Sequence, residues 1–385
     1  MSTISDYVRS VAELDFQQLS LNELDIVCLN ELAYLPFGEH LEVDCTVQFA
    51  DIRQRFEEVK ADIKTDFIVT KERIELFDLM LNSHRFSDLE LSHYVNDINS
   101  EFEKQFAAAV FCLPSINYWQ VAFRGTDDTL IGWKEDFKLT YLSEIPAQRS
   151  AVMYLRDFLE KAEHPVYVTG HSKGGNLAVY AASFQEPELQ QKIKAIYMLD
   201  APGFSTAFFQ KEGYQNIRSK LVVIKPKESI VGVMLKLDVT ALVVDANQFG
   251  VMQHAVTTWK VSEKGNFIAG QQTDLSKRLD KTFDQWISEL SKSELKLIVD
   301  LLFDTLIDAG ITSLNDLGTR EFGLKLLSAL AAMKQLNKSQ QTLLQKSLWN
   351  LIAAFAQNSK PEFKPSRHVD ELLKKFNLKE SETKV

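Results

Sequence analysis

The chain has 385 residues, which is enough for one large domain and a smaller appended region. Its composition, with 45% hydrophobic and 25% charged residues, is that of an ordinary globular protein. The formal net charge of -10 is not offset by any block of lysine and arginine, which argues against nucleic acid as a partner.

The sequence predicts a reduced, cytoplasmic protein. The opening segment contains acidic residues and no apolar run, unlike a secretory signal, and no stretch approaches the roughly 20 apolar residues that span a bilayer. Cys28, Cys45 and Cys112 are odd in number and are not spaced as a metal-binding pair, so we expect neither disulfides nor zinc. We expect no metal and no organic cofactor, while peripheral contact with a membrane surface stays open.

The first part of the chain has the apolar periodicity of helices. Leu24 and Val27 share one helical face, and Asn22 precedes them as an N-cap. We assign no strand before Phe106, so residues 1–105 are predicted to form an N-terminal helical segment.

Further along, apolar runs typical of strands alternate with helical patterns. The predicted strands cover residues 106–113, 118–123, 166–168, 195–199, 221–224 and 241–244. Predicted helices begin near Pro146 and after Ser172 and Ser205. This alternation predicts an α/β fold, with a mostly parallel sheet and helices on both faces.

From about Asp274 the pattern is helical again, and Ser291 with Glu294 fits a capping box. This part of the chain has no cluster of catalytic residue types. We therefore predict an α/β domain over residues 1–273 and a helical accessory domain over residues 274–385. The accessory helices offer a surface for a partner protein.

The segment VYVTGHSKGGNLAVYAA carries the strongest chemical signal. It places a G-x-S-x-G motif, from Gly170 to Gly174, between a predicted strand and a predicted helix, as a nucleophile elbow requires. Side chains two residues either side of Ser172 would collide with neighbouring backbone, which is why glycine stands there. The strained turn projects the hydroxyl beside a helix N-terminus, so Ser172 is the predicted nucleophile. In the alternative interpretation, Ser172 is an ordinary N-cap in a glycine-rich turn.

The two neighbours of Ser172 are assigned different roles. His171 is predicted to be structural and to point elsewhere, because adjacent residues on a tight turn face different sides. The backbone N–H of Lys173 directly follows the nucleophile and is the predicted first oxyanion donor. A phosphate-binding loop is rejected because the G-x-x-x-x-G-K-[ST] pattern is absent.

The upstream segment VAFRGTDDTLIGWKEDF supplies a second donor. Gly125 lets the backbone turn over the site, and Thr126 can offer its N–H, and also its hydroxyl, to an oxyanion. We expect Arg124 and Asp136 to form a structural ion pair that holds this loop.

Together, F-R-G-T, G-W-x-x-D-F and G-H-S-K-G-G-N-L-A resemble the motifs of class 3 lipases in the α/β-hydrolase superfamily. The likeness is greatest to the bacterial Mbeg-like lipase family and extends over roughly residues 1–270. It implies hydrolase chemistry, with Thr126 as oxyanion residue, Ser172 as nucleophile and His254 as the terminal histidine. At the position of the class 3 acid this chain has Ser229, which departs from a strict lipase triad.

A serine needs a base, and in α/β hydrolases the chain order is serine, acid, histidine. His254 and His368 both follow the elbow and its strands, but His368 lies beyond two long helices and is expected on the surface. His254 is therefore the predicted base. The acid is either Asp200, which ends a predicted strand and is favoured, or Glu228, which ends the next one.

We expect a serine esterase or lipase-like hydrolase that cleaves a small acyl ester or a lipid. One alternative is a non-catalytic binding or regulatory module on the same scaffold. Another is an acyl-thioesterase or acyltransferase with the same triad. Residues 230–235 are expected either to line an acyl pocket or to belong to the core.

Overall fold

The computed structural model describes residues 2–40, 46–63, 65, 70–99, 104–126, 129–311, 325, 328 and 336–357. Its centre is an eight-stranded sheet in which the strands lie in chain order. The strands are β1 (Val47–Gln48), β2 (Glu90–Asn99), β3 (Lys104–Leu113), β4 (Tyr118–Phe123), β5 (Val166–His171), β6 (Ile193–Leu199), β7 (Leu221–Pro226) and β8 (Leu242–Val244). Strands β1 to β4 pair antiparallel and β4 to β8 pair parallel, which confirms the predicted α/β class.

Strands β1 and β2 lie inside the segment that the sequence predicts to be helical, so that prediction is wrong over residues 47–48 and 90–99. In β2 only Leu91 and Ser92 are buried, and three of its last four residues, Asn-Asp-Ile-Asn, are polar. It pairs with the apolar β3, with an irregularity between Ser92 and Val95. Its pairing partner stabilises the strand, whereas its own Tyr94, Val95 and Ile98 stand among polar residues that give no continuous apolar or alternating pattern.

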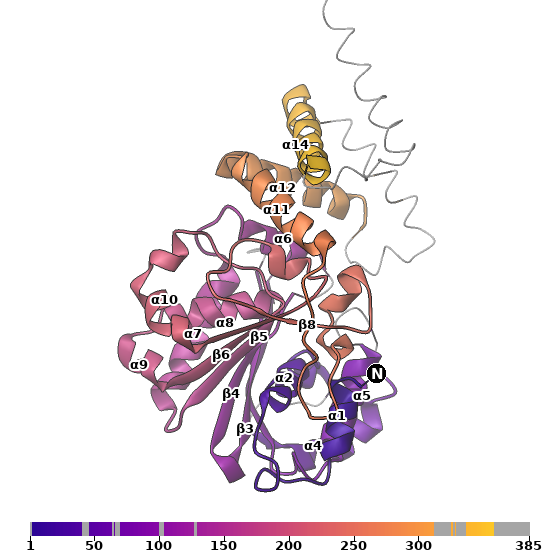
Figure 1. The fold of residues 1–385 in the computed structure, drawn as a ribbon, viewed down its shortest axis with the longest axis vertical. Helices are drawn as coiled ribbons and strands as arrows, with labels where there is room; N and C mark the ends of the chain where they lie inside the picture. Colours follow the sequence, from indigo (N-terminus) through magenta and orange to yellow (C-terminus); the bar gives the residue numbers. More distant parts are fainter. Residues whose placement is uncertain are drawn as a thin grey trace, which may run out of the picture.

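The crossover helices between the parallel strands pack on one face of the sheet. Right-handed crossovers between successive neighbouring strands place their helices on the same side. These helices are α7 (Pro146–Lys161), α8 (Lys173–Ser183), α9 (Pro187–Lys192) and α10 (Glu212–Ile217). The connection from β4 to β5 also contains α6 (Leu130–Lys138), which lies beside the C-terminal helices (Figure 1). Alternate residues of the strands, such as Val110 and Val121, share a core with α7 and α8 (Figure 1).

The opposite face would be bare without the N-terminal helices. These are α1 (Ile4–Val11), α2 (Glu23–Leu32), α3 (Phe37–His40), α4 (Phe49–Val59) and α5 (Lys71–Leu81). Their apolar residues form a second core with the other set of strand side chains, including Phe111 and Ala122. Two ion pairs are buried among them, Arg85 with Asp25 at 2.6 Å and Arg73 with Glu31 at 2.9 Å. The predicted helices on both faces are therefore present, and one face is covered from the N-terminus (Figure 1).

The C-terminal helices pack against α6 rather than against the sheet (Figure 1). They are α11 (Asp274–Ser288), α12 (Lys292–Asp308) and α14 (Lys338–Gln357). Trp286 and Phe303 belong to a third apolar cluster that includes Leu130 of α6, and Lys134 pairs with Asp304 at 2.7 Å. The capping box predicted at Ser291 is present.

Short 3-10 helices complete the described chain: η1 (Pro114–Ile116), η2 (Phe208–Gln210), η3 (Arg218–Lys220), η4 (Val231–Val233), η5 (Gly250–His254) and η6 (Val256–Thr258). Within the described ranges, every helix falls short of the length or apolar character that a bilayer-spanning helix needs.

Candidate active site

Ser172 stands on the sharp turn between β5 and α8, as predicted. Its backbone has φ of 58° and ψ of -136°, a region that non-glycine residues seldom occupy. Such strain persists only where the surrounding structure enforces it, and it is concentrated at functional sites. Ser172 precedes the first residue of α8, and its hydroxyl makes no capping hydrogen bond to that helix, so the alternative N-cap interpretation lacks its defining contact.

The glycines of the motif are required by close backbone contacts. A Cβ atom on Gly170 would lie 2.0 Å from the carbonyl oxygen of Gly174. One on Gly174 would lie 2.1 Å from the carbonyl oxygen of Phe123 at the end of β4. The elbow is thus pressed against the neighbouring strand, and this contact fixes where Ser172 stands above the sheet.

The imidazole of His254 is held by Asp200. His254 ends η5, and its Nδ1 lies 2.7 Å from Oδ2 of the Asp200 carboxylate. Asp200 follows β6 with φ of 38° and is 1% exposed. Its other oxygen accepts hydrogen bonds from the hydroxyl of Ser229 and, at 3.2 Å, from the N–H of Gly232. Ser229 stands where class 3 lipases have their acid, and here it donates a hydrogen bond to Asp200, the carboxylate that follows β6.

Glu228, the alternative acid, has a different set of contacts. Its Oε2 accepts from the backbone N–H of Gly250 and, at 2.9 Å, from Nε2 of Gln253. These bonds hold both ends of the 3-10 turn that carries His254. Of the two candidate carboxylates, the structure brings Asp200 to the imidazole and leaves Glu228 bound to the loop.

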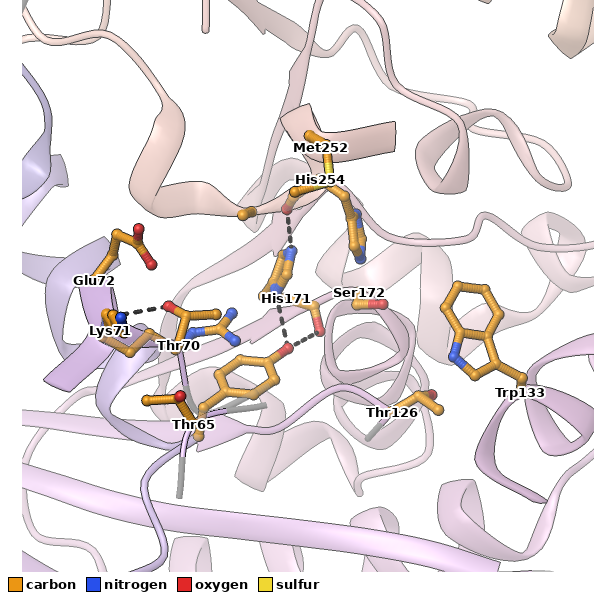
Figure 2. A pocket seen from close by; sticks show the side chains of 13 residues that line it. Thr65, Thr70, Lys71, Glu72, Thr126, Trp133, His171, Ser172, Met252 and His254 are labelled. Atoms are coloured by element: carbon orange, nitrogen blue, oxygen red, sulfur yellow. Dashed lines mark hydrogen bonds between the residues drawn. The ribbon is translucent and has the colours of Figure 1, made fainter. Parts of the chain in front are cut away.

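Ser172 and His254 line one cavity of about 310 Å³. Figure 2 shows the His254 ring directed toward Ser172, with Thr126 and Trp133 on the far side of the serine. Because Nδ1 of His254 donates to Asp200, the neutral ring carries its lone pair on Nε2, at the end facing the cavity. The cavity therefore combines a hydroxyl with an acceptor nitrogen.

The prediction that His171 points away from the site is wrong, because His171 also lines this cavity. Its ring is tilted against the His254 ring, with centroids 4.5 Å apart, and its Nε2 lies 2.8 Å from the carbonyl oxygen of His254. A carbonyl only accepts, so Nε2 carries the proton and Nδ1 accepts from the hydroxyl of Tyr34 at 2.7 Å. Burial lowers the pKa of His171 well below its ordinary value, which keeps the ring neutral.

The Thr126 loop differs from its predicted arrangement. The Thr126 hydroxyl donates to Oδ2 of Asp136 at 2.6 Å, so its backbone N–H is the group left for an oxyanion. Arg124 donates to Oδ1 of Asn96 at 2.9 Å, and Asp136 lies 3.8 Å from the ammonium of Lys173. The predicted Arg124–Asp136 ion pair is therefore wrong, because Lys173 takes the place of the arginine.

The side chain of Lys173, to which the sequence assigned no role, is fully buried. Its Nζ donates to Oε2 of Glu135 at 2.7 Å and to the carbonyl oxygen of Gln105 at 3.0 Å. Its backbone N–H stands at the first position of α8, where no carbonyl within the helix is available to it.

Sequence reasoning missed Tyr34, which lies 137 residues before His171 and lines the same cavity. Its hydroxyl accepts from the N–H of Gly125 at 3.1 Å and donates to His171, and its ring lies under Arg73 at 3.7 Å. No local pattern marks such a residue. Val233 and Leu235 line a different cavity from Ser172, and His368 lies outside the described residues.

Comparisons with known proteins add two findings. A family model described as Mbeg1-like matches residues 80–304, a stretch that begins and ends later than the region of resemblance noted in the sequence. Among solved structures, the chain is similar to M37 lipase with 17% sequence identity and a TM-score of 0.36, over 55% of this chain and 70% of that one. No curated protein matches it.

Proposed function

The chain belongs to the Mbeg1-like family, and we propose that it is a serine hydrolase that cleaves an acyl ester. The observation that carries the proposal is the 2.7 Å contact between Nδ1 of His254 and Asp200, in a cavity that His254 shares with Ser172. In serine hydrolysis Ser172 would be the nucleophile, His254 the base and Asp200 the acid that orients the base.

In this mechanism the hydroxyl of Ser172 attacks the ester carbonyl while Nε2 of His254 takes its proton. Asp200 holds the imidazole in the tautomer that leaves Nε2 free and stabilises the imidazolium that forms. The imidazolium then gives its proton to the departing alcohol, which leaves an acyl-enzyme. Water, activated by the same nitrogen, releases the acid and restores Ser172.

The negative charge on the tetrahedral intermediate needs donors. The backbone N–H groups of Lys173 and Thr126 are the proposed pair, and the N-terminus of α8 adds its favourable dipole. The Lys173 ammonium is engaged with Glu135 below the site and takes no part in this step.

The substrate is proposed to be an ester with an apolar acyl group. Trp133 and Met252 supply apolar surface to the cavity beside Ser172 and His254. At about 310 Å³ the cavity is at the small end of ligand sites, which favours short or partly exposed acyl chains.

A panel of p-nitrophenyl esters of increasing chain length tests the proposal, with the corresponding acyl thioesters alongside. We expect measurable hydrolysis that falls on the order of 10⁴-fold or more in Ser172→Ala and in His254→Gln. His164→Gln, at an exposed histidine, is the matched control and should keep full activity. Undiminished ester hydrolysis by the Ser172→Ala variant would contradict the proposal.

A further inference from the structure

A second cavity, of about 660 Å³, lies between the β7–β8 edge of the sheet, the chain from Gly232 to Val243, and α11. Its lining is mixed: Phe204, Val233, Leu237 and Ile287 supply apolar surface, and charged and hydroxyl side chains also line it. Neither Ser172 nor His254 is among the described residues that line it, so it is separate from the proposed active site.

A buried lysine faces this cavity. Lys225, on β7, is 9% exposed and lines the cavity. Among the described residues its ammonium has no hydrogen bond and no ion pair. Burial lowers the pKa of Lys225, and the charges of Asp280 and Asp200 oppose that shift. The ammonium ends at the cavity wall, where an anionic group could accept a charge-assisted hydrogen bond from it.

An acid faces the same space from α11. Asp280 is half-buried, lines the cavity and, within the described ranges, also has no hydrogen bond or ion pair. Burial raises the pKa of Asp280, and the charge of Lys225 lowers it. The two opposite charges affect each other but make no direct contact, so the lining presents both an ammonium and a carboxylate.

The remaining charged groups of the lining cancel each other. Lys236 and Asp284, both exposed, pair at 3.2 Å in the lining. The four lining charges thus sum to zero, which disfavours a ligand with a single net charge. A lining that offers both charges together with apolar side chains such as Phe204 and Ile287 matches a molecule that has both charges in its head and an apolar tail.

We propose that this cavity binds a single-chain zwitterionic amphiphile. The anionic part of its head contacts Lys225, the cationic part contacts Asp280, and its tail lies against the apolar side chains of the lining. The site does not depend on the proposed hydrolysis. It adjoins the active site through Gly232, which lines the cavity and donates its N–H to Asp200 at 3.2 Å.

Calorimetric titration tests the proposal with dodecylphosphocholine below its micelle concentration and the 385-residue Ser172→Ala chain, in which turnover is excluded. We expect saturable one-to-one binding that weakens roughly tenfold or more in Lys225→Met and in Asp280→Asn. Lys194→Met, at an exposed lysine of β6, should bind like the parent. Dodecyl sulfate and dodecyltrimethylammonium, which have the same tail and one charge each, should bind more weakly.

Ala241→Trp gives an independent check if the charge variants fold poorly, because it fills the cavity without altering a charge. It should abolish binding while the circular dichroism spectrum stays unchanged. Absence of saturable binding to the folded parent, equal binding in Lys225→Met, or tighter binding of either singly charged detergent would overturn the proposal. None of these results bears on ester hydrolysis by the wild-type protein.

Discussion

Nε2 of His171 donates to the backbone carbonyl of His254 at 2.8 Å, so the residue before the proposed nucleophile fixes the loop of the proposed base. Tyr34 continues the chain of hydrogen bonds to the Gly125 N–H beside the oxyanion loop. One neutral histidine thereby joins three loops that meet at the cavity. A buried hydrogen-bond network, and not the catalytic contacts themselves, fixes the positions of the elbow, the base and the oxyanion loop relative to one another.

Replacing Tyr34 by phenylalanine tests this network. The change removes the donor to His171 and the acceptor for Gly125, and leaves both groups buried and unsatisfied. We expect the free energy of unfolding to fall by about 1–3 kcal/mol in urea titrations. We also expect kcat for ester hydrolysis to fall, with little change in KM. Tyr167→Phe, at a partly exposed tyrosine of β5, is the matched control, and equal effects of both changes would contradict the account.

The identity of the acid is tested by Asp200→Asn beside Glu228→Gln. An asparagine at 200 can still accept from Ser229 and Gly232 but no longer fixes the catalytic tautomer of His254. We expect kcat to fall by about 10³–10⁴-fold with the fold intact. Glu228→Gln loosens the loop and should cost far less. A larger loss in Glu228→Gln than in Asp200→Asn would reverse the assignment.

The buried pair of Lys173 and Glu135 is predicted to act on stability and not on chemistry. Lys173→Met leaves the Glu135 carboxylate buried without its partner and should cost about 3–5 kcal/mol of unfolding free energy. The double variant with Glu135→Gln should recover part of that loss. Because the proposed oxyanion donor is the backbone N–H, kcat of the folded fraction should change far less than in Asp200→Asn.

Stability should depend on pH through Asp136. Burial raises its pKa to about 6, against the opposing effects of the Lys173 ammonium and the Thr126 hydroxyl. The folded chain therefore holds this proton more tightly than the unfolded chain, so the stabilisation is complete below about pH 4 and is lost as the pH rises through 6. The free energy of unfolding should fall by about 3 kcal/mol over this pH range.

Urea unfolding of wild type and Asp136→Asn between pH 4 and pH 7 measures this contribution. The wild type should lose stability relative to the variant as the pH rises. Parallel stability curves would show that Asp136 does not titrate in this range.

The sequence alone was sufficient to predict the elements whose structure is determined by local residue patterns. The glycine spacing around Ser172 identified the elbow because only glycine fits the contacts at Gly170 and Gly174. The alternation of apolar runs identified the parallel strands. The helical 1–105 prediction failed at β1 and at β2, because β2 has many polar side chains and is stabilised by its pairing with β3.

Long-range contacts were beyond the reach of sequence. The predicted Arg124–Asp136 pair was wrong because Lys173, from another element, lies beside Asp136. Tyr34 was missed because its partner His171 is 137 residues away in the sequence and no local pattern connects the two. The two-domain division and the catalytic roles stay predictions.

Mass-spectrometric mapping of a fluorophosphonate adduct tests the central claim most directly, because only a serine activated by a neighbouring base reacts quickly with this probe. The account predicts one adduct per chain, on the peptide that contains Ser172, formed rapidly in wild type and His164→Gln and slowly in His254→Gln. Folded wild-type protein that stays unlabelled, or that is labelled at another residue with Ser172 free, would contradict it.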